Sequence, residues 1–547
     1  MALILVNKPL FRSAINVLSG SLLALLGLLG CEPMDMPKPK DGLVYCSLGT
    51  PSSFNPQLST SANVVEATSL QLYDRLLRID LDGRSFKPAL ATSWQVDDSG
   101  TRYRFKLRQN VQFHSTEYFT PSRPFNADDV VFSFRRIIDK THPYHYVGRS
   151  DYSFFVSVGF PWLVKSVEAI DPSTVEFELF APDSTFLSNL ATNFAVILSA
   201  DYGQQLSARG ERHLIDKLPI GTGPFHFYRY KEEHFIKYRS HEAYWGVAPK
   251  LNEVVLDITP NGTMRLAKLL TGECDAMAFP LANELKMLRE KPEFQVQYQN
   301  GFNVGYWAFN TDTPPLNDAR VRKALALAIN RDPIMEAVFY GTASIASSLL
   351  PPASWGYDAT ASAEAYDPQR ARELLAEAGH PDGFDLDIWL LPVQRAYNPN
   401  SRKMALLLQD NLKQIGVHAH LVNHDWNAFR SGLSRGDHDS VLIGWTADNA
   451  DPDNFFRPLL SCQAKLAGTN RAMWCDKHYD QLIDEARLAT SFEKRQALYS
   501  QAQHYLVEQM PVVPIAHGMR TQASGEHVKG LTVEPFGGID FSSVTIE

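Results

Sequence analysis

The stretch 384–456 constrains the fold most, because its hydrophobic pattern switches repeatedly between two periods. Apolar residues in alternate positions, or in one short buried run, predict three strands at 384–390, 417–422 and 440–445. The apolar spacing from Ser401 predicts a helix that ends at Gly416, and a shorter helical piece begins at Asp425. Such strand–helix alternation is typical of a mostly parallel sheet with right-handed crossovers. The sequence therefore predicts an α/β fold.

Two charged residues follow these strands. Arg395 comes after the first strand and Asp448 after the third. Ligands in open α/β sheets bind just beyond the carboxyl ends of the strands. A ligand that lies between these two side chains would carry a carboxylate at one end and an ammonium at the other, as an amino acid or a short peptide does. The alternative is that both residues are solvated loop charges, because the strand-end rule is general rather than specific.

Length and charge exclude some classes of protein. A chain of 547 residues exceeds one ordinary domain, and about two to four domains are expected. An apolar content of 44% and a charged content of 21% are typical of a soluble globular protein. The net charge of −9 disfavours nucleic acid or an anionic membrane surface as the main partner.

The amino-terminal segment has the pattern of a targeting signal. Lys8 and Arg12 precede the apolar segment 18–30, which is too short to span a bilayer comfortably and leads into Cys31. The run Leu-Leu-Gly-Cys at 28–31 resembles the lipobox of bacterial lipoproteins, in which the cysteine is lipidated. The alternative is an ordinary cleaved signal peptide with a coincidental cysteine. Residues 32–41 contain three prolines and are predicted to form a tether.

Four further cysteines would lie outside the cytoplasm, where thiols oxidise. They are Cys46, Cys274, Cys462 and Cys475. An even number suggests two disulfides, for which three pairings are possible, and free buried thiols are the alternative. Cys462 and Cys475 are close enough in sequence to close a small loop, which would leave Cys46 with Cys274. No metal site is expected, because no acid or cysteine completes a ligand set with His142 and His145.

The order of elements predicts two lobes of unequal length. The pattern changes near residue 300, where an apolar strand is followed by two helices, and the strand 511–518 is predicted to cross back after a helical block. Two crossings form a hinge that permits closure over a ligand. The predicted division is a first lobe at 42–300 and 519–547, with an inserted subdomain at about 70–200, and a second lobe at 301–518.

A hydroxyl-rich loop precedes a predicted helix near the start of the first lobe. Thr60 and Ser61 lie in this loop and offer donors to a polar ligand. The alternative is that they only cap the helix.

Several segments carry a resemblance to a known family. They are LVYCSLGTPSSFNPQL, FNADDVVFSF, PIGTGPF, GFNVGYWAFNT, PVQRAYNPN and GWTADNADPDNFF. Through them the chain, from Leu43 to Glu547, resembles the periplasmic dipeptide- and oligopeptide-binding proteins of ABC importers. This large class of solute-binding proteins also contains a haem-binding lipoprotein and Sap-type peptide-binding proteins.

The resemblance implies a two-lobed periplasmic binding protein fold that closes over a peptide and presents it to a membrane permease. It implies that Arg395 holds the ligand α-carboxylate and Asp448 the α-ammonium. Trp445 and Tyr397 match aromatic residues of the pocket, and Thr60 and Ser61 match a loop that faces the cleft. It also implies the disulfides Cys46–Cys274 and Cys462–Cys475.

One departure concerns the size of the pocket. Ala62 and Ala447 stand where the family often has glycine. Their methyl groups could narrow the pocket, so dipeptide specificity does not transfer automatically.

Two other functions are alternatives. The same scaffold could bind haem, but the sequence offers no obvious axial ligand: His424 lies near the end of a predicted strand and could be a plain surface histidine. A secreted peptidase is disfavoured, because the chain has no HExxH motif, no GxSxG elbow and no cysteine left for a nucleophile once the disulfides form. We therefore expect a monomeric binding protein without catalytic residues or a cofactor.

Overall fold

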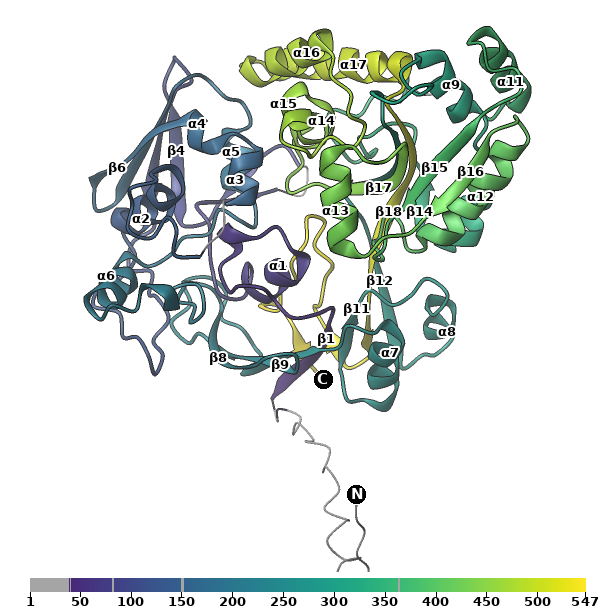
Figure 1. Cartoon of the computed structure of the whole chain (residues 1–547). Helices are drawn as coiled ribbons and strands as arrows, with labels where there is room; N and C mark the ends of the chain where they lie inside the picture. Colours follow the sequence, from purple (N-terminus) through teal and green to yellow (C-terminus); the bar gives the residue numbers. More distant parts are fainter. Residues whose placement is uncertain (1–38, 40, 81–82, 149–151, 363–364) are drawn as a thin grey trace, which may run out of the picture.

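The computed structural model describes residues 39, 41–80, 83–148, 152–362 and 365–547 (Figure 1). The predicted signal segment, Cys31 and nearly all of the predicted tether lie outside these residues. Within the described ranges, no helix is both long enough and apolar enough to cross a membrane. Strands and helices are interspersed along the chain, so the α/β prediction is confirmed.

Twelve strands form one continuous sheet through the molecule, in the order β16-β15-β17-β13-β18-β11-β1-β10-β9-β8, with β12 and β14 attached to β18. Their bounds are β1 Gly42–Ser47, β8 Phe225–Lys231, β9 Phe235–Ser240, β10 Glu253–Ile258, β11 Ala276–Ala278, β12 Phe294–Asn300, β13 Asn303–Phe309, β14 Ala343–Ile345, β15 Asp385–Leu390, β16 His418–Val422, β17 Ser440–Thr446 and β18 Val512–Gly525.

β18 joins the two halves of this sheet. Its first part, up to Gly518, pairs with β13 and β14, and its second part, from Met519, pairs with β12 and β11. Only Gly301 and Phe302 separate β12 from β13. The chain therefore passes between the two halves at two places that lie side by side.

The predicted unit of alternating strands and helices is confirmed. β15 pairs in parallel with both β16 and β17, and the connecting helices are α12 Ser401–Lys413 and α13 Trp426–Arg435. The Asn400 side chain accepts a hydrogen bond from the Lys403 amide at 2.9 Å and caps α12. Gly416 has φ +82°, a conformation that favours glycine, and ends the helical segment.

Alternate residues of β13 face two different layers, as the period of a strand requires. Tyr306 and Ala308 pack in a core with residues of α14, α16 and α17, whereas Trp307 and Phe309 pack with residues of α9, α11 and α12. The helices of this half are α9 Ala319–Leu327, α10 Asp332–Ile334, α11 Pro368–Glu377, α14 Asp453–Leu460, α15 Cys462–Leu466, α16 Lys477–Leu488 and α17 Phe492–Gln509. This part of the sheet is thus the middle layer of three.

A separate sheet of four strands in the order β4-β5-β7-β6 builds a second body, drawn in blue in Figure 1. Its strands are β4 Ala91–Val96, β5 Arg102–Leu107, β6 Val164–Asp171 and β7 Thr174–Leu179. Residues of β5 are alternately exposed and buried, and the buried face packs on α2 Ala127–Ile138 in an aromatic-rich core. A capping box between Asn126 and Asp129 starts α2.

The remaining elements are short. The helices are α1 Ala62–Thr68, α3 Ser153–Ser157, α4 Phe160–Leu163, α5 Phe186–Leu190, α6 Ala200–Ala208, α7 Gly262–Thr271 and α8 Leu285–Arg289. Two small hairpins pair β2 Leu77–Ile79 with β3 Phe86–Pro88, and β19 Val528–Lys529 with β20 Thr545–Ile546.

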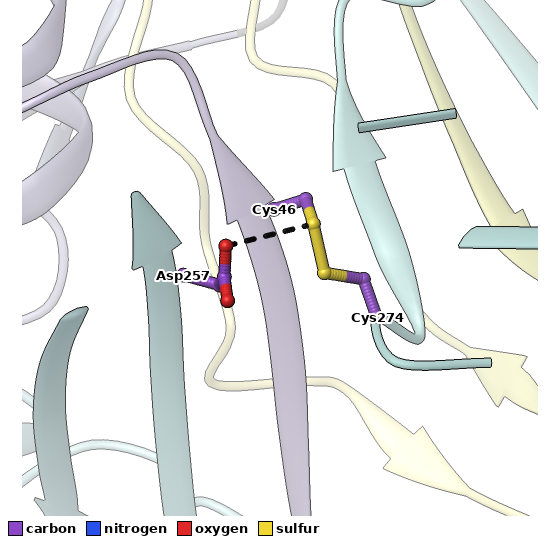
Figure 2. A group of neighbouring side chains, drawn as sticks. All are labelled: Cys46, Asp257 and Cys274. Carbon is purple, nitrogen blue, oxygen red and sulfur yellow. Dashed lines mark hydrogen bonds between the residues drawn. A yellow bond between two sulfur atoms is a disulfide. The ribbon is translucent and has the colours of Figure 1, made fainter. Parts of the chain in front are cut away.

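Both predicted disulfides are present, Cys46–Cys274 and Cys462–Cys475. Figure 2 shows the first of them beside Asp257, whose carboxylate lies 3.9 Å from the Cys46 sulfur. The Asp257 carboxylate accepts hydrogen bonds from the Lys268 ammonium at 2.7 and 2.9 Å. Because both sulfurs are bonded to one another and Asp257 is paired with a cation, we assign no metal site to this group.

Candidate ligand-binding site

Arg395 lies on a tight turn after β15. The backbone N–H groups of Arg395 and Asn398 each donate to the carbonyl oxygen of the other, at 3.2 and 3.0 Å. The Arg395 side chain is exposed, and its Nη1 donates to the Gln394 carbonyl oxygen at 2.8 Å. Its guanidinium lies 5.9 Å from the Trp426 ring. No buried carboxylate holds this guanidinium among the described residues, so it can rotate to meet a ligand.

Glycines on three adjacent strands form the surface on which this turn lies. Gly444 of β17 and Gly305 of β13 are register partners, and Gly518 lies on β18 next to β13. A methyl group on Gly305 or Gly444 would overlap Tyr397, and one on Gly518 would overlap the carbonyl of Ala396. Tyr397 is therefore buried against the sheet, and the glycines set the position of the turn that carries Arg395.

Gly305→Ala is expected to destabilise the protein by about 1–3 kcal/mol, because overpacking displaces the turn, and to weaken ligand binding through Arg395. Urea unfolding and calorimetry would measure the two effects. Gly262→Ala at the start of α7 is a matched control, since the three atoms nearest to its methyl group belong to the Leu281 side chain, at 3.3 to 3.5 Å, and none is a backbone atom. Equal stability of the two variants would contradict this positioning role.

Asp448 lies in the loop after β17 and lines a cavity. Its backbone N–H donates to the Asn454 side-chain oxygen at 2.9 Å, which fixes the start of the loop. Its carboxylate forms no ion pair within the described part of the chain. Desolvation by the surrounding protein raises the pKa of Asp448 to about 7, and a hydrogen bond with the Asn454 side chain opposes this only in part. A carboxylate in this state is stabilised by any cation that reaches it.

The cavity measures about 160 Å³ and lies between distant segments of the chain. Its walls include Tyr73, Asp74, Arg75, Arg78, Asn193, Tyr244, Asp448, Asn449, Glu534, Phe536 and Asp540. Only Asp448 had been predicted from the sequence. The other residues come from separate segments with no shared motif, so no local pattern could have gathered them.

Trp445 lines a different and much narrower cavity, of about 10 Å³, with Asn189 and Arg457 among its neighbours. The Trp445 indole N–H has no hydrogen-bond partner in the described ranges. A ligand or water acceptor would satisfy it, because an unpaired buried donor is unfavourable.

Thr60 and Ser61 are exposed at the start of α1 and are not among the residues that line the Asp448 cavity. Ser61 occupies the N-cap position, yet its side chain makes no capping hydrogen bond. The structure thus brings Asp448 together with Arg75 and Glu534, and leaves Thr60, Ser61 and Arg395 outside this cavity.

Direct contacts hold the two sides of the cavity region together. The Asn449 side chain donates to the Asn189 side-chain oxygen at 3.3 Å, and the Ser184 amide donates to the Arg487 carbonyl at 3.0 Å. The Arg84 guanidinium lies 3.7 Å from the centre of the Phe492 ring. These contacts join the four-stranded body to the loop and helices at α14–α17. The two sides of the cavity region are therefore in direct contact in this structure.

Known proteins resemble this chain in sequence and in structure. The family model described as "Bacterial extracellular solute-binding proteins, family 5 Middle" matches residues 85–466. The chain belongs to this family. Its peptide-binding resemblance, its mixed α/β architecture and its two lobes are thereby confirmed.

Individual relatives of this family 5 protein carry different names. It is 42% identical to the peptide transport periplasmic protein SapA of Salmonella typhimurium, over 96% of this chain and 97% of that protein. It is 40% identical to the heme-binding protein A of Haemophilus influenzae, over 92% of each chain. The crystal structure of a dipeptide binding protein from Pseudoalteromonas sp. SM9913 in complex with Met-Leu superposes with a TM-score of 0.85 at 45% identity, and covers 92% of this chain and 100% of that one.

Proposed function

We propose that this family 5 protein is the solute-binding component of an ABC peptide importer, which binds dipeptides or short peptides between its lobes and delivers them to a membrane permease. The observation that carries the proposal is Asp448, a desolvated carboxylate that lines a cavity and has no cation partner among the described residues. The α-ammonium of a peptide supplies the missing charge.

The two ends of the peptide would be held by different means. Asp448 binds the ammonium inside the cavity, and Arg395 swings from its exposed turn to bind the carboxylate in a bidentate manner. Tyr397 supports that turn, and Trp445 offers its unpaired N–H. Thr60 and Ser61 would face the cleft from the first lobe. Because the termini and backbone supply the affinity, different peptide side chains can be accepted.

The lobe division proposed from the sequence explains how the site closes. It assigns 42–300 and 519–547 to the first lobe, with the subdomain 70–200 inserted, and 301–518 to the second. The hydrogen bond between Asn449 and Asn189 would then form only on closure, since it joins the two lobes. Closure excludes water, and a charge without a partner is strongly disfavoured in such a site.

The location follows from the same proposal. The protein would act in the periplasm as a monomer, anchored to a membrane by a lipid on Cys31. It would have no catalytic activity of its own. Incubation with a dipeptide, followed by chromatography of the peptide, would contradict this last point if cleavage products appeared.

Calorimetry with matched ligands tests the proposal. Ala-Ala is expected to bind. N-acetyl-Ala-Ala is expected to bind about a hundredfold more weakly, because it leaves the desolvated Asp448 carboxylate unpaired, and Ala-Ala-amide is expected to bind more weakly because it loses the charge-assisted hydrogen bonds to Arg395. Haem is titrated in parallel. No heat with Ala-Ala, together with a Soret shift on addition of haem, would replace peptide by haem as the ligand.

A further inference from the structure

The charges that line the Asp448 cavity are unequal. Four carboxylates, of Asp74, Asp448, Glu534 and Asp540, face two guanidinium groups, of Arg75 and Arg78. A ligand must supply the opposite charge to any of these groups that has no charged partner inside the protein.

Asp74 and Arg78 are matched with each other. The Arg78 guanidinium donates to the Asp74 carboxylate at 3.3 Å. The same carboxylate accepts hydrogen bonds from the Trp245 indole N–H at 2.8 Å and from the Thr222 hydroxyl at 3.0 Å. This pair therefore leaves little net charge for a ligand.

Arg75 is held by uncharged groups. Its Nη1 donates to the Ala191 carbonyl oxygen at 3.0 Å and to the Asn193 side-chain oxygen at 2.9 Å. No carboxylate within the described residues forms an ion pair with it. Its charge nevertheless acts on Asp74, Glu534 and Asp540 at longer range, so one cation is shared by three acids.

Of the four carboxylates that line the cavity, that of Glu534 has the fewest partners. Its carboxylate forms no hydrogen bond or ion pair in the described ranges, whereas Asp540 accepts one from the Ser542 amide at 2.8 Å. Burial and then the charge of Asp540 raise the pKa of Glu534. The charges of Arg75, Arg520 and Arg78 act in the opposite direction. Arg520, which lies beside Gly537, interacts with the buried Glu66 as well, and Arg78 is paired with Asp74.

The loop that carries Glu534 is fixed in the cavity. Phe536 packs against Phe302 with ring centres 4.7 Å apart, and the Asn193 side chain donates to the carbonyl oxygen of Gly537 at 3.1 Å. The loop is drawn in yellow between the two sides of the molecule in Figure 1. Glu534 is therefore presented to the cavity by a supported backbone.

We propose that Glu534 is a specificity-determining residue that favours peptides with a lysine or arginine side chain. The inference rests on the proposed function: the α-ammonium takes Asp448, and one acidic charge of the Glu534–Asp540 pair then remains without a cation. A basic side chain supplies it. A small cavity, below the roughly 300–1,000 Å³ of ordinary ligand sites, suits one such side chain better than a long peptide.

Calorimetry compares Lys-Ala and Ala-Lys with their uncharged analogues, in which norleucine replaces lysine. At least one lysyl peptide is expected to bind about tenfold more tightly than its analogue. Glu534→Gln should remove this preference and leave the affinity for the norleucine peptide unchanged. Glu526→Gln, at an exposed site outside the cavity, is the control and should keep the preference.

The outcomes separate the two proposals. If the norleucine peptides bind and neither lysyl peptide binds better, the role of Glu534 is overturned and peptide binding stands. A preference that survives Glu534→Gln, or tighter binding of Glu-Ala, overturns it as well. If none of the peptides binds, the proposed function itself fails. Should Glu534→Gln not fold, the ratio of lysyl to norleucyl affinity in the natural protein decides.

Discussion

Asp448→Asn is expected to lower dipeptide affinity about a hundred- to a thousandfold, because the peptide ammonium would be buried without an anionic partner. Asparagine keeps the size of the side chain and can still bond to Asn454, so the loop after β17 should keep its shape. Calorimetry with Ala-Ala measures the change. The melting temperature shows whether the fold is intact.

Asp98→Asn is the matched control for this variant. Asp98 is exposed in the turn of the β4–β5 hairpin and is not among the residues that line the cavity. Its loss should leave the affinity unchanged. A folded Asp448→Asn protein that binds Ala-Ala as tightly as Asp98→Asn does would exclude Asp448 as the ammonium partner.

The pH dependence of dipeptide binding should also report the protonation of the Asp448 carboxylate. The pKa of Asp448 is raised to about 7 by desolvation, so the carboxylate is ionised above this pH and protonated below it. Below pH 7 a proton must leave before the ammonium binds, and affinity should fall about tenfold for each unit of pH. Titrations across this range should show the slope, which Asp448→Asn should abolish.

Arg495→Met is expected to lower the free energy of unfolding by about 3–5 kcal/mol, because it leaves a buried carboxylate without its cation. The Arg495 guanidinium donates to both oxygens of Asp451, at 2.9 and 2.8 Å. The two side chains are only 10% and 4% exposed. Since this pair ties the loop of Asp448 to α17, dipeptide affinity should fall too. Urea unfolding and calorimetry measure the two effects.

Arg435→Met provides the comparison for a surface pair. Arg435 and Asp437 form an ion pair whose side chains are 61% and 44% exposed. Exposed pairs contribute less than about 1 kcal/mol, so this variant should unfold close to the natural protein. If Arg495→Met unfolds at the same urea concentration as Arg435→Met, the buried pair does not hold the loop.

Local patterns were sufficient for the elements around the site. The alternation at 384–390 and the helical spacing after Ser401 predicted the bounds of β15 and α12 to within a few residues. Gly416 marked the end of the helical segment. These features depend on residues close in sequence, because caps and periodicity are properties of one segment. The even number of cysteines likewise indicated two disulfides, both of which are present.

The sequence by itself determined the order of elements, the two-lobed class and a charged residue, Asp448, at the end of a strand. Only the tertiary structure decided which side chains share a cavity with it, because Arg75, Glu534 and Asp448 are brought together by packing between segments that lie far apart in the chain. It also decided that Arg395 is exposed on its turn, since the glycines that support that turn lie on three other strands. Which side chains line one cavity depends on contacts between distant segments, and no periodicity along the chain encodes these contacts.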